Sequence, residues 1–190
     1  SIIMLGLASN WMAASFLFFT IFFYTVVYSV FLKRRTPQNI VIGGAAGAFP
    51  PIIGWVAMTE SINLLPIILF IIIFLWTPPH FWSLALVKTE DYKKANIPMM
   101  PNVVGESSTK NQILFYSFLL LISSLSPFIL GLTGYIYFFG SFTMSLGFCF
   151  LSIGLIIFPN RKLEIPLFVY SIFYLFGIFV FLVIDKYFVV

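Results

Sequence analysis

Residues 64–94 read LLPIILFIIIFLWTPPHFWSLALV, followed at once by KTEDYKK. No Asp, Glu, Lys or Arg occurs from Leu64 to Val87, and this run is long enough for one helix to cross a hydrocarbon layer of about 30 Å. His80, the one histidine of the chain, lies in this run between a Pro-Pro pair and a tryptophan. The sequence therefore predicts a membrane span that carries an ionisable side chain and ends in a charged segment.

The rest of the chain is equally apolar. Of its 190 residues, 61% are hydrophobic and 8% are charged, whereas charged residues make up about 25% of an ordinary soluble domain. The apolar runs are continuous over about twenty residues, which favours helices over the alternating strands of about ten residues in a membrane barrel. We therefore expect an all-α, polytopic bundle of transmembrane helices that forms a single membrane-embedded domain over residues 1–190.

The apolar runs predict six complete spans. They are expected at about Trp11–Leu32, Asn39–Met58, Leu64–Val87, Ile113–Phe139, Ser141–Phe158 and Pro166–Ile184, after residues 1–8, which read as the end of a seventh. Pro50-Pro51 predicts a kink or break in the second span. The long polar segment 88–112 contains prolines interleaved with apolar residues, and we expect it to form an ordered cap on the membrane face.

Lys and Arg gather in alternate loops, at residues 33–35, 88–110 and 161–162. The positive-inside rule assigns this shared side to the cytoplasm, or to the matrix in a mitochondrion, and the C-terminus to the opposite side. These cations serve topology, so the net charge of +4 does not call for a nucleic-acid partner. The bacterial plasma membrane and the mitochondrial inner membrane both fit this composition.

His80 has two readings. It can be a hydrogen-bonded structural residue, but ionisable side chains within membranes are costly and mark functional sites. Pro78-Pro79 should disturb the helix beside it, and Trp76 and Trp82 offer flat aromatic faces to a planar apolar ligand. A neutral imidazole in such surroundings can coordinate an iron porphyrin or donate a hydrogen bond to it.

The charged segment after Val87 contains Lys88, Glu90 and Asp91. If the helix continued beyond His80, Asp91 would lie about 16 Å further along, outside the hydrocarbon. Mg²⁺ usually takes one or two carboxylates together with phosphate oxygens of a substrate, and the nearby lysines could bind the rest of a diphosphate. A solvated loop of mixed charge explains the same residues.

The second span opens with a basic cluster and small residues. Lys33-Arg34-Arg35 can serve topology alone, although Arg is also well shaped for bidentate phosphate contacts. Gly43 and Gly47 have the spacing that lets another helix approach closely, which is a commoner use of such residues than phosphate binding.

Three segments, taken in this order, resemble a known family. They are KRRTPQNIVIGGAAGA at 33–48 with PPIIGW at 50–55, WTPPHFW at 76–82, and DYKKANIPMMP at 91–101. They closely resemble the haem-farnesylating enzymes of the UbiA-type intramembrane prenyltransferases. The resemblance covers residues 1–112 strongly and the later spans by pattern only.

The resemblance implies transfer of the farnesyl group of farnesyl diphosphate to a vinyl group of haem B, which gives haem O for terminal oxidases. Mg²⁺ and basic side chains would stabilise the departing diphosphate while an allylic cation develops, and the site must exclude water, which would quench that cation. Expected partners are therefore both substrates, the lipid bilayer, and haem A synthase or terminal oxidase assembly.

The resemblance also implies roles for individual residues. Asp91 falls in the second acidic motif and would face the metal diphosphate, with Glu90 as a weaker candidate metal ligand. Lys33 and Arg34 match the family's basic pair, and Lys88 would be a phosphate partner beside Asp91. His80 matches the histidine of the family's Pro-His motif and would lie near haem, with the aromatic face of Trp82 near it. Lys110 and Asn111 fit the family pattern after the cap.

One departure from the family is large. The family's first Asn/Asp-rich motif, between its second and third helices, is absent from this sequence, so the chain should hold about half of the metal and diphosphate site and be inactive alone. Two alternatives stay open: a prenyltransferase for an aromatic quinone precursor, or a non-catalytic membrane transporter or subunit.

Overall fold

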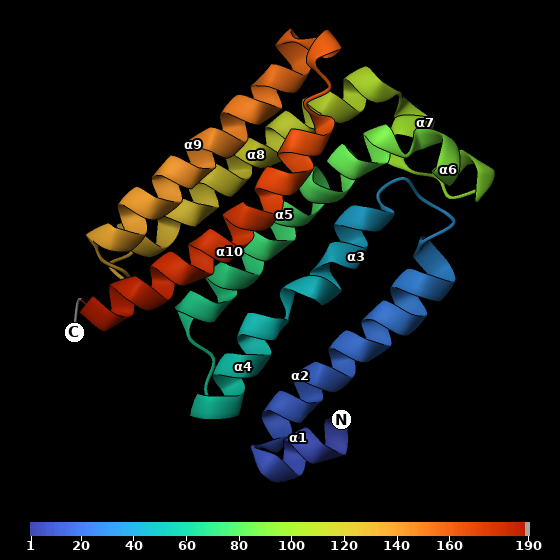
Figure 1. Cartoon of the computed structure of the whole chain (residues 1–190). Helices are drawn as coiled ribbons and strands as arrows, with labels where there is room; N and C mark the ends of the chain where they lie inside the picture. Colours follow the sequence, from blue (N-terminus) through green and yellow to red (C-terminus); the bar gives the residue numbers. More distant parts are fainter. Residues whose placement is uncertain (189–190) are drawn as a thin grey trace.

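Helices make up almost all of the computed structural model, which describes residues 1–188, and no strand occurs in that range (Figure 1). The α-helices are α1 (Ile2–Ala8), α2 (Trp11–Phe22), α3 (Asn39–Ala48), α4 (Pro50–Thr59), α5 (Leu64–Val87), α6 (Thr89–Lys94), α7 (Met100–Val104), α8 (Glu106–Ile129), α9 (Tyr135–Ile157) and α10 (Glu164–Phe188). A π-helical stretch, η1 (Phe23–Leu32), continues α2, and a 3₁₀ turn, η2 (Pro159–Arg161), follows α9.

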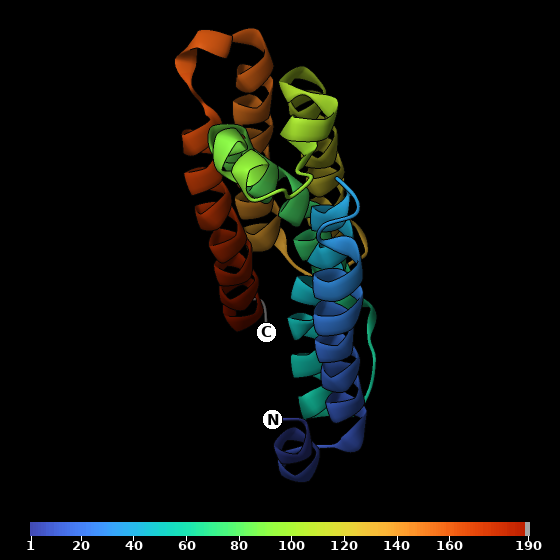
Figure 2. The ribbon, with the colours of Figure 1, turned by 90° about the vertical axis from the view of Figure 1, so that its right-hand side faces the viewer.

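Helix α5 is the centre of the bundle. It packs against α8 and α10 on one side and against α3 and α4 on the other, and α9 packs between α8 and α10. Figure 2 shows α9 and α10 on one side of the molecule and α2 to α4 on the other. The main core is built from α5, α8, α9 and α10 around large buried side chains such as Ile72, Trp82, Tyr137 and Tyr174.

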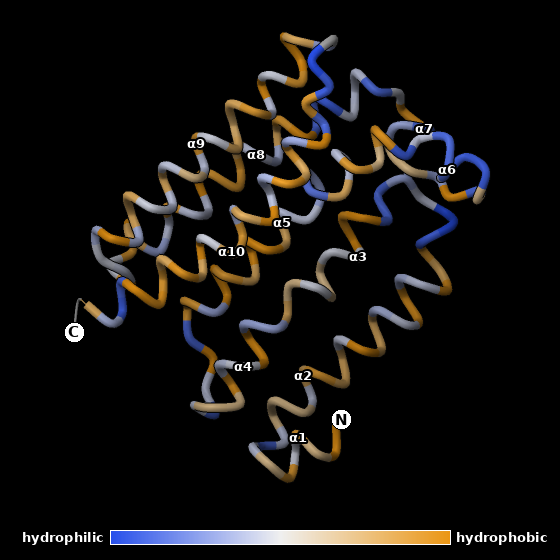
Figure 3. The backbone as a smooth tube through the Cα atoms, viewed as in Figure 1, coloured by the Kyte–Doolittle hydropathy of each residue, from blue (hydrophilic) through white to orange (hydrophobic). Residues whose placement is uncertain are grey.

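The structure confirms the predicted all-α membrane bundle. Six helical segments in the described part are long and apolar enough to cross a membrane, and the predicted third span matches α5 exactly. Figure 3 shows the long helices mainly hydrophobic and the connecting segments more hydrophilic. Many large apolar side chains on the outer surface are exposed, as a lipid-facing surface requires.

The two proline pairs behave differently. The predicted break at Pro50-Pro51 is confirmed, since α3 ends at Ala48 and α4 begins at Pro50. The expected disturbance at Pro78-Pro79 is wrong, because α5 runs through both prolines without interruption. Packing of α5 against helices on both sides holds it in place despite the lost backbone hydrogen bonds.

The predicted boundary between the fourth and fifth spans, at residues 139–141, is also wrong. Helix α8 ends at Ile129 and α9 begins at Tyr135. Gly131 makes the turn with a φ of +69°, whereas Gly140 lies within α9, where an added Cβ would collide with the Phe181 ring of α10. Gly140 is therefore a close-packing residue and not a turn residue, a distinction that depends on a helix more than forty residues further along the chain.

The predicted cap segment, residues 88–112, is partly helical. It contains α6 and α7, and residues 106–112 instead form the first turns of α8. The last predicted span, Pro166–Ile184, likewise lies inside a longer helix, α10.

Asp185 joins the last helix to the start of α9. Its side chain is buried, and its two carboxylate oxygens accept hydrogen bonds from the backbone N–H groups of Gly134, at 2.6 Å, and Tyr137, at 3.1 Å. The next residue, Lys186, donates to the carbonyl oxygen of Leu132 at 2.7 Å. The free N–H groups at a helix start favour an acidic partner, so Asp185 caps α9 from a different helix.

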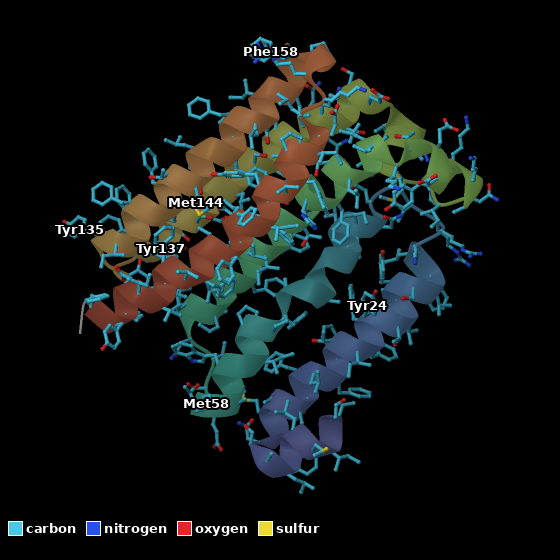
Figure 4. The ribbon with its side chains drawn as sticks, viewed as in Figure 1. Tyr24, Met58, Tyr135, Tyr137, Met144 and Phe158 are labelled. Carbon is cyan, nitrogen blue, oxygen red and sulfur yellow. The ribbon has the colours of Figure 1, made fainter. Side chains whose placement is uncertain are left out.

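Serine and tyrosine hydroxyls hold α8, α9 and α10 together. Ser117 and Ser152 lie 2.8 Å apart between their Oγ atoms, and the Tyr174 hydroxyl lies 2.6 Å from Ser124 Oγ and 3.2 Å from Ser145 Oγ. Hydroxyl pairs of this kind stabilise helix contacts where no water is available. In the same region, Figure 4 labels Tyr137 and Met144 on α9.

Gly43 and Gly47 form a matched pair for testing the packing of α3. A Cβ on Gly43 would collide with the Tyr28 ring of η1, whereas a Cβ on Gly47 would meet nothing within 4 Å. We expect Gly43→Ala to destabilise the protein by about 1–3 kcal/mol. Gly47→Ala should be neutral or stabilising by up to about 1 kcal/mol, because Ala favours helix. Thermal unfolding in detergent measures both, and equal behaviour of the two variants would contradict the close approach of α3 to η1.

Candidate functional site

The His80 ring is held in a stack of aromatic side chains. Trp76, one turn earlier on α5, lies with its ring centroid 4.2 Å away at an interplanar angle of 18°. Phe168 of α10 stacks at 4.7 Å and 21°, and Phe81 meets the imidazole edge-on at 5.0 Å. Only 9% of His80 is exposed. These contacts fix the plane of the imidazole.

Hydrogen bonds tie this stack to α10. His80 Nδ1 lies 2.6 Å from Ser171 Oγ, and the Ser171 hydroxyl donates to the carbonyl oxygen of Phe168 at 2.5 Å. Trp76 Nε1 donates to the carbonyl oxygen of Ser171 at 2.8 Å. Since the partners come from α5 and α10, the position of His80 depends on the packing of these two helices.

Two cavities meet at Trp76. The first, which we call the histidine groove, has a volume of about 510 Å³ and is lined by Trp76, His80, Phe168, Ile172, Leu175, Phe176 and Phe179. The second, the glycine hollow, has a volume of about 300 Å³ and is lined by Tyr24, Tyr28, Ile40, Gly43, Gly44, Gly47, Ile73, Trp76, Thr77 and Phe81. Figure 4 shows Tyr24 between η1 and α3. Both cavities are mainly apolar, as sites for hydrophobic ligands are.

Trp82, predicted to lie near haem, is not in the histidine groove. It is fully buried in the main core and meets Tyr116 of α8 edge-on at 5.5 Å. Two residues of helix turn a side chain by about 200°, so Trp82 and His80 lie on opposite faces of α5. Trp76 is the tryptophan that the structure brings to His80.

The predicted acidic residues lie on α6, just beyond the end of α5. Asp91 and Lys88 form an exposed ion pair, with 3.3 Å between Oδ2 and Nζ. Glu90 is exposed as well, and as the immediate neighbour of Asp91 on a helix it points in a different direction. The two side chains leave this helix in directions about 100° apart.

Asn39 links the basic loop to the segment after α5. Its buried side chain donates from Nδ2 to the carbonyl oxygens of Lys33, at 3.1 Å, and Pro98, at 3.5 Å. Lys33 and Arg34 themselves are exposed. The loop that carries these cations and the segment that carries Asp91 therefore lie at the same end of the bundle, as Figure 1 also shows.

Lys110 and Asn111 lie in a different place. They line a cavity of about 300 Å³ between the start of α8 and the end of α9, together with Glu106, Ser107, Leu155, Ile156 and Pro159. Lys110 pairs with Glu164 at the start of α10, with 3.4 Å between Nζ and Oε1. The structure does not bring these two residues to the histidine groove.

The sequence did not identify Ser171, Phe168 or Asn39 as parts of the site. Ser171 and Phe168 belong to an apolar helix about ninety residues after His80 in the sequence, and no motif marks them. Asn39 offered a weak signal, because it is an amide at the first position of an apolar span.

A comparison of the chain with known protein families gives a match. The UbiA prenyltransferase family matches residues 1–183. The chain belongs to the UbiA prenyltransferase family. Membership of this family, together with the six apolar helices, makes it a multi-pass membrane protein.

Several curated UbiA relatives are about half identical to the chain. Proteins named protoheme IX farnesyltransferase from Bartonella henselae and Rhizobium meliloti are each 52% identical over 97% of this chain and 61% and 60% of their own lengths. The protein of that name from Parvibaculum lavamentivorans is 50% identical over 98% of this chain and 60% of its own length. The chain thus spans about 60% of the length of these relatives. No solved structure matches it.

Proposed function

We propose that the whole protein transfers the farnesyl group of farnesyl diphosphate to a vinyl group of haem B. The names of the relatives support this activity at 50–52% identity. The structural observation that carries it is His80, stacked between aromatic rings in an apolar groove, on the same helix that leads to Lys88 and Asp91. Helix α5 would thus supply an acceptor end within the membrane, and α6, which follows it directly, a diphosphate end at the surface.

The histidine groove suits the macrocycle of haem. Its walls are aromatic and aliphatic, and His80 is the only side chain among the lining residues with a basic nitrogen. A planar iron porphyrin can stack on such walls and meet an imidazole. The same walls exclude water, which protects a developing allylic cation from hydrolysis.

The surface end suits a diphosphate. Lys88 next to Asp91, and Lys33 and Arg34 on the loop tied by Asn39, supply positive charge at one end of the bundle. We propose that Lys33, Arg34 and Lys88 bind the phosphate oxygens and hold the leaving group as its bond to the farnesyl carbon breaks. Positive charge fixed there stabilises the departing diphosphate.

We propose that Asp91 contributes to a shared Mg²⁺ site. No group of three His, Cys, Asp or Glu side chains among residues 1–188 can hold a metal ion. One carboxylate with substrate phosphate oxygens is nevertheless a usual Mg²⁺ environment, so Asp91 fits as one of its ligands and Glu90 as a less favourable one. When bound, the metal would neutralise the charge that develops on the leaving diphosphate.

We further propose that the end carrying α6 faces the cytoplasm, or the matrix, and that the C-terminus lies on the other side. The arrangement of basic loops supports this orientation in a bacterial plasma membrane or a mitochondrial inner membrane. Product delivery to haem A synthase or to terminal oxidase assembly fits the same location.

To test this, the complete protein in lipid vesicles is incubated with farnesyl diphosphate, haem B and Mg²⁺. The pigments are then extracted and analysed by mass spectrometry. Farnesylated haem is the expected product, and chelation of Mg²⁺ should stop its formation. A prenylated aromatic ring in a parallel assay with quinone precursors, without farnesylated haem, would contradict the proposal. Absence of any turnover that depends on farnesyl diphosphate would contradict prenyl transfer altogether.

A further inference from the structure

The Ser171 hydroxyl has a single hydrogen and two close polar neighbours. Its Oγ lies 2.5 Å from the carbonyl oxygen of Phe168 and 2.6 Å from His80 Nδ1. A carbonyl oxygen can only accept, so two oxygens 2.5 Å apart need the hydroxyl hydrogen between them. The Ser171 hydroxyl therefore donates to the carbonyl oxygen of Phe168. Ser171 Oγ must then accept from Nδ1, since two lone pairs facing each other at 2.6 Å would repel. His80 is therefore the tautomer with its hydrogen on Nδ1.

The rest of the pocket prevents the ring from changing this arrangement. Trp76 and Phe168 hold the imidazole from both faces, so it can turn only within its own plane. The bond to Ser171 opposes that rotation, and the bond from Trp76 Nε1 to the Ser171 carbonyl oxygen keeps α10 in register with α5. The other ring nitrogen, Nε2, makes no hydrogen bond to residues 1–188. His80 is one of the residues that line the histidine groove.

We propose that Ser171 is a positioning residue that fixes His80 as the Nδ1–H tautomer and presents the Nε2 lone pair to an iron porphyrin in the histidine groove. The identity of this ligand rests on the proposed function. A histidine that donates its other ring hydrogen to a neighbouring oxygen is held in orientation and is a better ligand through its free nitrogen. Ser171 thus acts on the acceptor through His80, without contact to it.

Nitrogen NMR of the complete protein, labelled with ¹⁵N-histidine and free of haem, tests the tautomer. The His80 signals are assigned by their loss in His80→Gln. The wild type should show Nδ1 protonated and Nε2 unprotonated, Ser171→Ala should shift His80 toward the Nε2–H form, and Ser171→Thr should keep the wild-type pattern because its hydroxyl can replace that of Ser. Ser117→Ala removes another buried hydroxyl, from the pair with Ser152, and should leave the His80 signals unchanged.

Haem titration of the same variants tests the consequence. Ser171→Ala should weaken haem binding about 10-fold or more and alter the absorption spectrum of the bound haem, whereas Ser171→Thr and Ser117→Ala should not. An Nε2–H tautomer in the wild type, or unchanged NMR signals in a folded Ser171→Ala variant, would overturn the positioning role. A different outcome is the expected NMR result together with a haem affinity that changes in neither the His80 nor the Ser171 variant. That outcome would overturn the link between Nε2 and haem, and with it the acceptor end of the proposed function.

Discussion

Replacing Asp91 by Ala in the complete protein is expected to lower the rate of farnesyl transfer by about 100-fold or more. The carboxylate is the candidate Mg²⁺ ligand of α6, and without it the charge on the leaving diphosphate is less well neutralised. Insertion and stability should hardly change, because the side chain is exposed and its ion pair with Lys88 is a surface pair. Initial rates of haem farnesylation at saturating substrate measure the effect.

Glu90→Gln is the matched control, because Glu90 is the exposed neighbour of Asp91 on the same short helix. This change should leave most of the activity. Asp91→Asn separates charge from size and should behave like Asp91→Ala. Wild-type rates in a folded Asp91→Ala variant would remove Asp91 from the metal site, and a larger loss from Glu90→Gln would transfer the role to Glu90.

Asp185→Ala is expected to lower the free energy of unfolding by about 3 kcal/mol, because two backbone N–H groups at the start of α9 lose a charged acceptor. The Asp185 side chain and Tyr137 are both buried, so water cannot easily replace the carboxylate there. Asp185→Asn keeps one oxygen acceptor and should lose less. Thermal unfolding in detergent, followed by circular dichroism, measures the difference.

Lys186→Met is the control for this position. The Lys186 side chain is exposed and bonds a carbonyl oxygen of the same turn, so its loss should cost less than about 1 kcal/mol. If Asp185→Ala unfolds at the wild-type temperature, Asp185 does not cap α9 in the membrane.

The sequence predicts the spans best where local chemistry decides their ends. Val87 is followed by charge, so the end of α5 is predicted correctly. A Pro-Pro pair is a less decisive signal, because Pro50-Pro51 coincides with the predicted α3–α4 break but Pro78-Pro79 lies inside α5. Gly131 and Gly140 look alike in sequence. Gly131 takes a positive φ in the turn, whereas Gly140 packs against Phe181 of α10, a contact that the local sequence does not reveal.

The candidate site also contains residues that the local sequence reveals and residues that only the packing of helices reveals. His80 and Asp91 can be singled out as candidates from sequence, because an ionisable residue in an apolar run and an acid after its end are unusual locally. Ser171 and Phe168 cannot, since their role comes from the packing of α10 on α5. Trp82 is close to His80 in the sequence, which suggested a shared ligand. Its position on the opposite face of α5 places it in the core instead.

The most direct test of the central claim, that α5 and α6 carry an acceptor end and a diphosphate end, is a pair of binding titrations. The complete protein, His80→Ala and Asp91→Ala are each titrated with haem B alone, and with an unreactive farnesyl diphosphate analogue in the presence of Mg²⁺. We expect His80→Ala to weaken haem binding about 10-fold or more, a change of at least about 1.4 kcal/mol, and to leave binding of the analogue unchanged. Asp91→Ala should do the reverse. Equal weakening of both ligands by either substitution, or no change in either, would contradict the account.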